Sequence, residues 1–404
     1  MKFENPALIF GAHHIGLWVV RDLGRRGIEI YTVGEDKTCV AFKSKYCKFR
    51  VIIPKPWNQQ KMKLVLKGIA KKTTKRLVVY ALNDIDTLNL SLIKDNLRDD
   101  FYFVVGDREA TETLVNKLKF YHALEKSKIE FPKTFFPKNL DDVRNLSENI
   151  SYPVFIRPAI TELFIHAFGY RKGFLANSSE ELVKYYRLAT SRKIKVMLQE
   201  VIPGPPANSI QLEGYFKKDY GFIGIFARQR LRIWPPNFGN TTLCTSIAPF
   251  QFNVITQKIT EFLKSIGYNG LASAELKKDT RDGKYKLLEI NARPWLHFWL
   301  AARCGIDILF LSYLDAVGKK LNFDSEKKYI VGYKSLDFWS DIPASVNMIL
   351  KNELTFRDWL SSLYGVKRFT FFAKDDPLPF FSTFYNQLKV ALGNAFCQIR
   401  QNLV

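Results

Sequence analysis

The chain has 404 residues and carries 61 Lys and Arg against 39 Asp and Glu, a formal net charge of +22. Hydrophobic residues make up 47% of it, which allows a sizeable core and excludes a disordered chain. The longest apolar stretch, residues 295–317, is broken by His297, Arg303 and Asp307, so we expect no membrane span. The length indicates two or three domains.

Cysteine usage and charge limit the compartment and the partners. The five scattered cysteines lack the spacing of a metal site and indicate free thiols in a reducing compartment. No signal-peptide pattern follows Met1, so we expect a cytoplasmic protein. The positive charge favours polyanionic partners, although a Lys-rich solvated surface explains it equally well. Because no nucleic-acid-binding motif accompanies the charge, nucleic acid is not the expected partner.

The first hundred residues predict a parallel sheet, because apolar runs alternate with helical patterns. The expected strands are residues 6–12, 28–33, 77–82 and 101–106, and the expected helices are residues 15–27 and about 86–98. The loop GAHHIG departs from the G-x-G-x-x-G dinucleotide-binding pattern, since His13 takes the place of the second Gly. We interpret it as a tight turn.

Further along the chain, shorter strands are interspersed with helices. The expected helices are residues 112–128, 179–189 and 251–266, and the expected strands are residues 152–158, 169–176, 196–204, 209–216, 221–229, 271–278 and 284–291. The last two strands flank the turn-rich DTRDG and predict a β-hairpin. From about residue 330 the pattern is aromatic-rich and irregular, and it ends in an amphipathic helix near 382–400.

This hairpin carries the most informative side chains. Glu289 and Asn291 are two residues apart, so they leave the same face of their strand. Folding the hairpin about Asp282 places Glu275 opposite Glu289, which brings two carboxylates and an amide oxygen together. Such hard oxygen ligands suit Mg²⁺ that is shared with phosphates. A pair of acids on a solvated face is the alternative.

Three segments, in the same order along the chain, resemble the core motifs of the ATP-grasp superfamily: YPVFIRP at 152–158, LQEVIPG at 198–204 and AELKKDTRDGKYKLLEINARPW at 274–295. They are most similar to a carboxylate–amine ligase subgroup that resembles D-aspartate ligase and the carbamoyl-phosphate synthase large subunit. SKY at 44–46, RQRLRIWPPNFG and DDPLP at 375–379 extend the similarity.

The resemblance implies an α/β fold, with an N-terminal parallel βαβ (pre-ATP-grasp) domain at 1–110 followed by the two α+β subdomains of an ATP-grasp fold. The small (lid) subdomain with its entry helix would span 111–205, the C-terminal subdomain with the metal site 206–330, and a C-terminal extension 331–404. It also implies a ligase that uses ATP and Mg²⁺ (or Mn²⁺), activates a carboxylate as an acyl-phosphate and joins it to an amine.

The expected substrates are therefore a small-molecule carboxylate and an amine, whose identity the sequence does not give. An anionic polymer or a lipid-linked acceptor would suit the positive charge. Peripheral membrane contact and a homo-oligomer stay open as well.

By the same resemblance, Glu275, Glu289 and Asn291 would bind Mg²⁺ on the β- and γ-phosphates. Arg293 would contact the transferring phosphoryl group or the acyl-phosphate. Arg157 is a departure, because the superfamily usually has Lys there, and a planar guanidinium is not interchangeable with an ammonium at a phosphate. We still expect Arg157 to face the nucleotide phosphates and to act in catalysis.

The nucleotide is expected to meet further residues that match the superfamily. Glu200, Val201 and Ile202 would form the hinge whose backbone groups meet the adenine edge. Lys117 and Lys172 match lysines that contact phosphate or adenine. For Lys117, a solvated helix surface is the alternative.

Three arginines alternate along FARQRLRIW. In an extended strand Arg228, Arg230 and Arg232 share one face, an arrangement that suits a phosphate or a carboxylate. We assign Arg230 to catalysis on this basis, and a basic solvated strand edge is the alternative.

Two functions of other classes stay open. The Arg at position 157 suggests a catalytically degenerate nucleotide-binding scaffold, and the charge with the expected terminal helix suggests a basic nucleic-acid or membrane-surface adaptor. His13, His14 and His297 could bind substrate or transfer a proton. Because a lone His is more often structural, we assign them no role.

Overall fold

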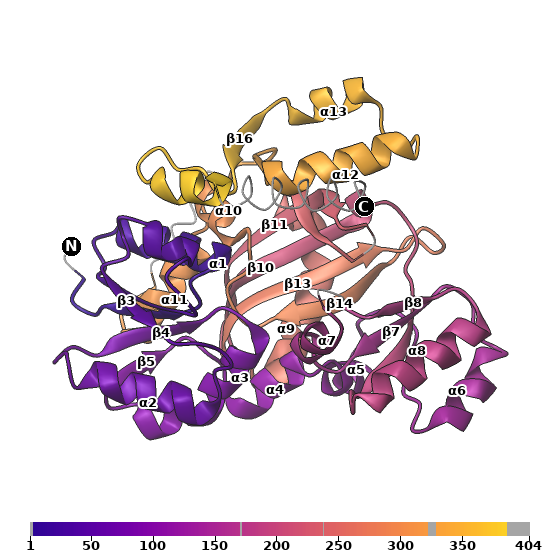
Figure 1. Cartoon of the computed structure of the whole chain (residues 1–404), viewed down its shortest axis with the longest axis horizontal. Coiled ribbons are helices and arrows are strands. Elements are labelled where there is room, and N and C mark those ends of the chain that lie inside the picture. The colour runs from indigo at the N-terminus through magenta and orange to yellow at the C-terminus, as the bar shows by residue number, and fades with distance from the viewer. Residues whose placement is uncertain (1–2, 170–171, 237, 322–328, 386–404) are drawn as a thin grey trace, which may run out of the picture.

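The computed structural model of the chain describes residues 3–169, 172–236, 238–321 and 329–385, which form three sheets (Figure 1). One sheet is parallel and has five strands, and the others have four and seven strands. This arrangement confirms the α/β class expected from the sequence. The expected helix near 382–400 lies almost wholly outside the described residues, which end at Tyr385.

The N-terminal sheet has the order β3-β2-β1-β4-β5 with all neighbours parallel. Its strands are β1 (Ala7–Phe10), β2 (Ile30–Gly34), β3 (Phe49–Ile52), β4 (Leu77–Ala81) and β5 (Phe101–Phe103), and its helices are α1 (His14–Gly24), α2 (Gln59–Ala70) and α3 (Asp84–Ile93). Every residue of β1 and β4 is buried, as expected of central parallel strands. β3 and α2 were not predicted, because β3 is largely exposed and the Lys-rich α2 buries only three residues.

The four-stranded sheet has the order β6-β9-β7-β8 and is antiparallel. Its strands are β6 (Thr134–Phe135), β7 (Val154–Pro158), β8 (Phe174–Ala176) and β9 (Val196–Glu200), and its helices are α6 (Leu140–Ser147), α7 (Thr161–Phe168) and α8 (Ser179–Ser191). The sequence did not predict α7, which fills the connection between β7 and β8.

The chain enters this sheet through two helices, α4 (Arg108–Val115) and α5 (Lys117–Leu124), where the sequence predicted one. Asn116 between them has an extended backbone, and its side chain accepts hydrogen bonds from the backbone N–H groups of Leu118 and Lys119. Asn is a strong N-cap residue, so it ends one helix and starts the next.

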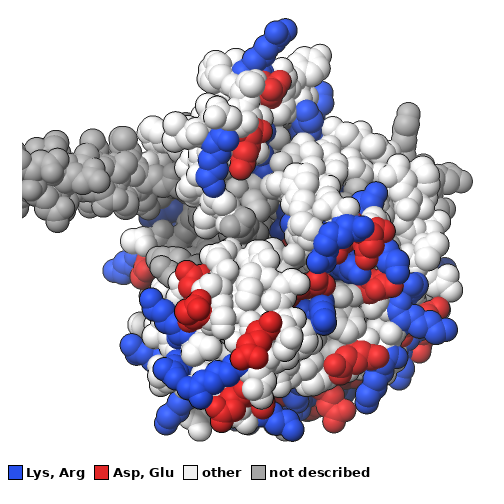
Figure 2. Space-filling view, turned by 90° about the vertical axis from the view of Figure 1, so that its right-hand side faces the viewer, with Lys and Arg blue, Asp and Glu red and all other residues white. Residues whose placement is uncertain are grey.

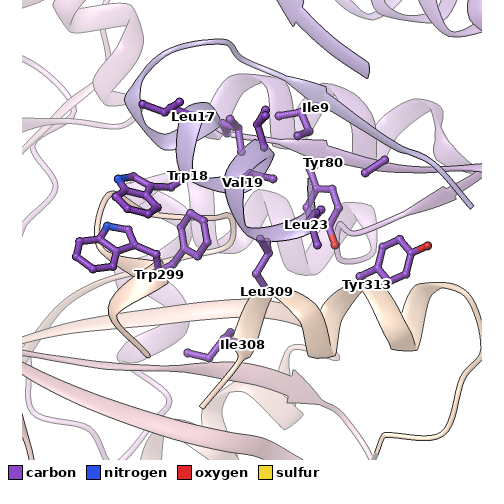
Figure 3. Packing of buried hydrophobic residues seen from close by; sticks show 14 of the residues in the cluster. Ile9, Leu17, Trp18, Val19, Leu23, Tyr80, Trp299, Ile308, Leu309 and Tyr313 are labelled. Carbon is purple, nitrogen blue, oxygen red and sulfur yellow. The ribbon is translucent and has the colours of Figure 1, made fainter. Parts of the chain in front are cut away.

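The large sheet has the order β14-β13-β10-β11-β12-β15-β16. Its strands are β10 (Ser209–Lys217), β11 (Gly221–Trp234), β12 (Asn240–Ile247), β13 (Gly270–Lys278), β14 (Tyr285–Asn291), β15 (Lys334–Leu336) and β16 (Val366–Phe369). Helices α9 (Asn253–Ser265), α10 (Phe298–Arg303) and α11 (Ile308–Ala316) accompany it. Figure 3 shows how α1 packs on α10 and α11, with Trp18 stacked on Trp299 at a ring distance of 4.5 Å.

The prediction that the chain is irregular beyond residue 330 is wrong. β15 and β16 add two strands to the large sheet, and α12 (Phe338–Leu350) and α13 (Phe356–Leu363) lie above it in Figure 1. The strands are too short to show a pattern, and apolar residues on the exposed face of α12 obscure its helical period. We call residues 331–385 the extension.

Two motifs that are more than three hundred residues apart fix the extension to the N-terminal sheet. The buried Asp376 of DDPLP accepts hydrogen bonds from Arg21 Nε at 2.8 Å, from Ser44 Oγ at 2.7 Å and from the backbone N–H of Lys45 at 2.9 Å. Ser44 and Lys45 belong to SKY. The indole of Trp18 also donates to a backbone carbonyl of the extension.

Candidate functional site

The hairpin of β13 and β14 forms as predicted. Glu275 pairs directly with Glu289, and Ser273 pairs with Asn291. The described residues contain no group of three His, Cys, Asp or Glu side chains that could hold a metal ion by themselves. Two carboxylates beside an amide oxygen fit Mg²⁺ that takes its remaining ligands from phosphates and water, because all three groups offer hard oxygen donors.

Basic side chains neutralise both carboxylates. Glu289 lies 2.9 Å from a terminal nitrogen of Arg157 and 3.3 Å from Lys117 Nζ, and Arg230 lies 2.6 Å from Glu275. Burial alone would raise the pKa of Glu289, but Lys117, Arg157 and Lys172 hold that pKa far below its ordinary value. Both carboxylates are thus paired with cations that a polyphosphate would also attract.

Arg157 at the end of β7 points into the protein rather than to solvent. Besides Glu289, its guanidinium donates to Gln199 Oε1 at 3.0 Å and to the Tyr121 hydroxyl at 3.3 Å. The planar fork thereby spreads its contacts over two nitrogen atoms, a geometry that a compact ammonium does not share. Lys117 is only 3% exposed, so the solvated-surface alternative for this residue is wrong.

Arg293 joins the hairpin to two acidic residues that sequence reasoning missed. Its Nε donates to Asp84 of α3 at 2.5 Å, and another nitrogen donates to Asn291 at 3.2 Å. Glu162 of α7 accepts from the backbone N–H of Asp84 at 3.1 Å, and burial together with Asp84 raises the pKa of Glu162 to about 6. No local sequence pattern identifies either acid as a site residue, because the contacts join three segments that are far apart in the sequence: α3, α7 and the residues after β14.

The predicted hinge residues begin at Glu200, the last residue of β9. Glu200 accepts from the backbone N–H of Lys133 at 2.7 Å and from Arg281 at 2.8 Å, which ties the end of β9 to the residue before β6 and to the tip of the hairpin. Val201 and Ile202 follow it along the wall of the same cavity. Their backbone roles toward adenine stay predictions.

These residues surround a cavity of about 680 Å³, a size typical of ligand sites. Every predicted site residue lines it except Lys117, which is buried behind Glu289. Lys172 lies at the rim, where Nζ donates to Asn240 Oδ1 at 3.0 Å.

The prediction that three arginines of β11 share one face holds for two of them. Arg228 and Arg230 line the cavity, but Arg232 pairs with Asp341 of α12 at 2.8 Å. The pairing of β11 with β12 shifts register between Arg230 and Arg232, so the strict alternation assumed from the sequence ends there.

The cavity continues beyond the hairpin to residues that were given no role. They come from the start of α1 and the residue before it, from the segment before α10 and from the extension: His13, His14, Ile15, Trp295, Leu296, His297, Asp337, Trp339, Ser340 and Phe371. The extension could not be recognised as a wall of the site, because the sequence pattern there shows no regular structure.

No family model matches the chain. Over 244 residues it is 29% identical to D-aspartate ligase of Enterococcus faecium. This alignment covers 58% of the chain and 57% of that relative's length.

Solved structures share the fold at low identity. The L-amino acid ligase of Bacillus licheniformis has a TM-score of 0.63 at 16% identity, over 83% of this chain and 79% of that one. The biotin carboxylase domain of 2-oxoglutarate carboxylase from Hydrogenobacter thermophilus, solved with MgADP and bicarbonate, has a TM-score of 0.63 at 16% identity, over 82% and 74%. N5-carboxyaminoimidazole synthetase of Staphylococcus aureus has a TM-score of 0.62 at 13% identity, over 83% and 82%.

These similarities confirm the resemblance to the ATP-grasp superfamily, and within it to ligases such as D-aspartate ligase. None of the relatives' names supports a polymeric or lipid-linked acceptor.

Proposed function

We propose that the protein is an ATP- and Mg²⁺-dependent carboxylate–amine ligase that works through an acyl-phosphate. The observation that carries the proposal is the pair Glu275 and Glu289, set beside Asn291 in a cavity that also contains Arg157 and Arg293. A polyphosphate and a metal ion would together satisfy this mixture of partly buried acids and bases.

In this proposal Glu275, Glu289 and Asn291 would hold Mg²⁺, which would offset negative charge on the β- and γ-phosphates. Arg157 and Lys172 turn from their present partners to the phosphates, and the segment 200–202 contacts the adenine edge. Manganese would fit the same oxygen ligands.

The reaction then needs mostly positioning and charge dispersal from the protein. A substrate carboxylate oxygen attacks the γ-phosphorus, the bond to ADP breaks, and Arg293 and Arg230 stabilise the charge on the transferring group. The amine attacks the acyl carbon, the C–N bond forms and the C–O bond to phosphate breaks. The amine proton leaves with the phosphate as hydrogen phosphate.

An amino acid is the first carboxylate to test. D-aspartate ligase and L-amino acid ligase are named for amino-acid substrates, and the chain resembles both. D-aspartate is therefore the leading candidate, followed by the other D- and L-amino acids.

The experiment measures ADP release from MgATP by the full chain with each amino acid, with and without hydroxylamine. Hydroxylamine converts an acyl-phosphate to a hydroxamate, which is detected directly. Carboxylate-dependent ADP release with an equal amount of hydroxamate supports the proposal. ADP release that is independent of any carboxylate would refute it.

A further inference from the structure

We call one end of the cavity the part that is lined by elements other than the hairpin and by none of the predicted nucleotide or metal residues. His14 is the first residue of α1, Trp295 and His297 come from the segment before α10, and Trp339 and Phe371 come from the extension. The contacts of Asp376 described above hold the extension against the N-terminal sheet, so this wall has a defined position.

Few charged groups line this end. Arg228 is paired with the buried Glu213 at 2.7 Å, and burial raises the pKa of Asp337, a buried carboxyl that also lines it. Burial lowers the pKa of His297 to about 3 and that of His14 to about 4, so both imidazoles are uncharged at neutral pH. The ring of Phe371 lies 4.4 Å from that of His14. The surroundings are therefore aromatic and weakly polar, unlike the cationic end near Arg157.

His297 also has an acceptor that lacks a partner. Its Nε2 lies 3.3 Å from the carbonyl oxygen of Thr241, and because a carbonyl only accepts, Nε2 carries the proton. A neutral imidazole then has a lone pair on Nδ1, and this atom is buried without a hydrogen-bond partner among the described residues. The side chain is 1% exposed. A buried unpaired acceptor is costly unless a ligand supplies a donor.

A second residue at this end has an unpaired group. The indole N–H of Trp339 has no hydrogen-bond partner among the described residues. A molecule with both an N–H group and oxygen atoms would match these groups. An amino acid has both, and its uncharged amine is the nucleophile that the ligase reaction needs.

We propose that this end of the cavity binds the amine substrate, an amino acid, with Trp339 and Phe371 of the extension as its wall and His297 Nδ1 as the acceptor of the amine N–H. The inference rests on the proposed ligase function and adds where the second substrate binds. A low-polarity wall favours the free amine over the ammonium ion, because burial disfavours the charged form. The free amine can attack the acyl carbon directly.

The test separates acyl-phosphate formation from amine transfer in the full chain. Hydroxylamine is small and does not depend on contacts with Trp339 and Phe371, so the hydroxamate reports formation of the acyl-phosphate. An amino acid from the panel that forms an amide product reports use of the amine site. We compare Trp339→Ala with Phe338→Ala, its neighbour on the same helix, which is more than one-third exposed and does not line the cavity.

Trp339→Ala should raise the KM for the amino acid about tenfold or more, the loss expected for a truncated aromatic anchor. Hydroxamate formation should change less than about twofold, and Phe338→Ala should resemble the unchanged protein. His297→Gln, whose amide can still donate to Thr241 but lacks the Nδ1 acceptor, should raise the same KM.

Equal amino-acid KM values for Trp339→Ala, His297→Gln and the unchanged protein would overturn the inference, and so would an equal loss of hydroxamate and amide. If the unchanged protein forms no hydroxamate, the proposed function itself would be refuted, and this inference, which rests on it, would fall as well.

Discussion

At the level of single residues, the two carboxylates of the hairpin already have basic partners before any ligand binds. Lys117 and Arg157 contact Glu289, and Arg230 contacts Glu275. Exchange of these partners is therefore part of ligand binding in our account: the bases go to the phosphates and the acids to the metal ion.

Glu289→Gln should lower turnover at least about a hundredfold, because the metal ion loses a charged ligand that stabilises the transferring group. Gln retains the volume of the side chain, so thermal unfolding should show a folded protein. Glu130→Gln is the control, since Glu130 is exposed, pairs with Lys284 and Lys286 of the hairpin and does not line the cavity. Equal turnover in the two variants would refute the metal assignment.

Arg157→Lys should retain turnover within about tenfold of the unchanged protein, because the ammonium keeps the charge but loses the bonds to Gln199 and Tyr121. Arg157→Ala should lose about a hundredfold or more, since an entire phosphate contact disappears. Steady-state ADP release measures both. If Arg157→Ala matches Arg157→Lys, this side chain does not act on the nucleotide.

Partner exchange also predicts that metal and nucleotide bind together. Calorimetry with Mg²⁺ alone should show weak binding or none, because free Mg²⁺ must compete with Arg157, Lys117 and Arg230 for the acids. ADP with Mg²⁺ should bind at least about tenfold tighter than ADP alone, a coupling of about 1.4 kcal/mol. Tight binding of Mg²⁺ without nucleotide would contradict partner exchange.

At the level of elements, the extension depends on a buried ion pair. Arg21 is 0% exposed and Asp376 is 2% exposed, so Asp376→Asn leaves a buried guanidinium without its counter-charge. We expect a loss of about 3–5 kcal/mol in the free energy of unfolding, measured by urea denaturation.

The neighbouring Asp375 provides the control. Its side chain is 42% exposed and pairs with Arg25 on the surface, so Asp375→Asn should cost less than about 1 kcal/mol. Similar losses in both variants would show that the buried pair does not fix the extension.

The elements that were predictable from the sequence are those whose structure follows from the pattern of neighbouring residues. The alternation of β14 and the length of its turn fix which residues face Glu289, so the hairpin was predicted correctly. Helix α7 and the strands of the extension were not, because they are short and depend on distant partners. The contacts of Asp84 with Arg293 and of Glu162 with Asp84 were not predicted either, because only the tertiary fold brings these distant residues together.

At the level of the whole molecule, the excess of positive charge does not form a continuous basic surface on the face shown in Figure 2. Lys and Arg are mixed there with Asp and Glu. No helix in the described parts of the chain has the length and apolar character needed to cross a bilayer. The cysteines of the described chain, Cys39, Cys47, Cys244 and Cys304, are free, as expected, and are buried, and Cys397 lies outside those residues.

The most direct test of the central claim follows oxygen atoms through the whole reaction. The protein is given MgATP, an amine and an amino acid whose carboxylate is labelled with ¹⁸O, and the released phosphate is analysed by mass. Attack of the carboxylate on the γ-phosphorus predicts that each phosphate carries one ¹⁸O atom, because the acyl C–O bond breaks later. Unlabelled phosphate would mean that water attacks ATP directly, and it would contradict an acyl-phosphate ligase.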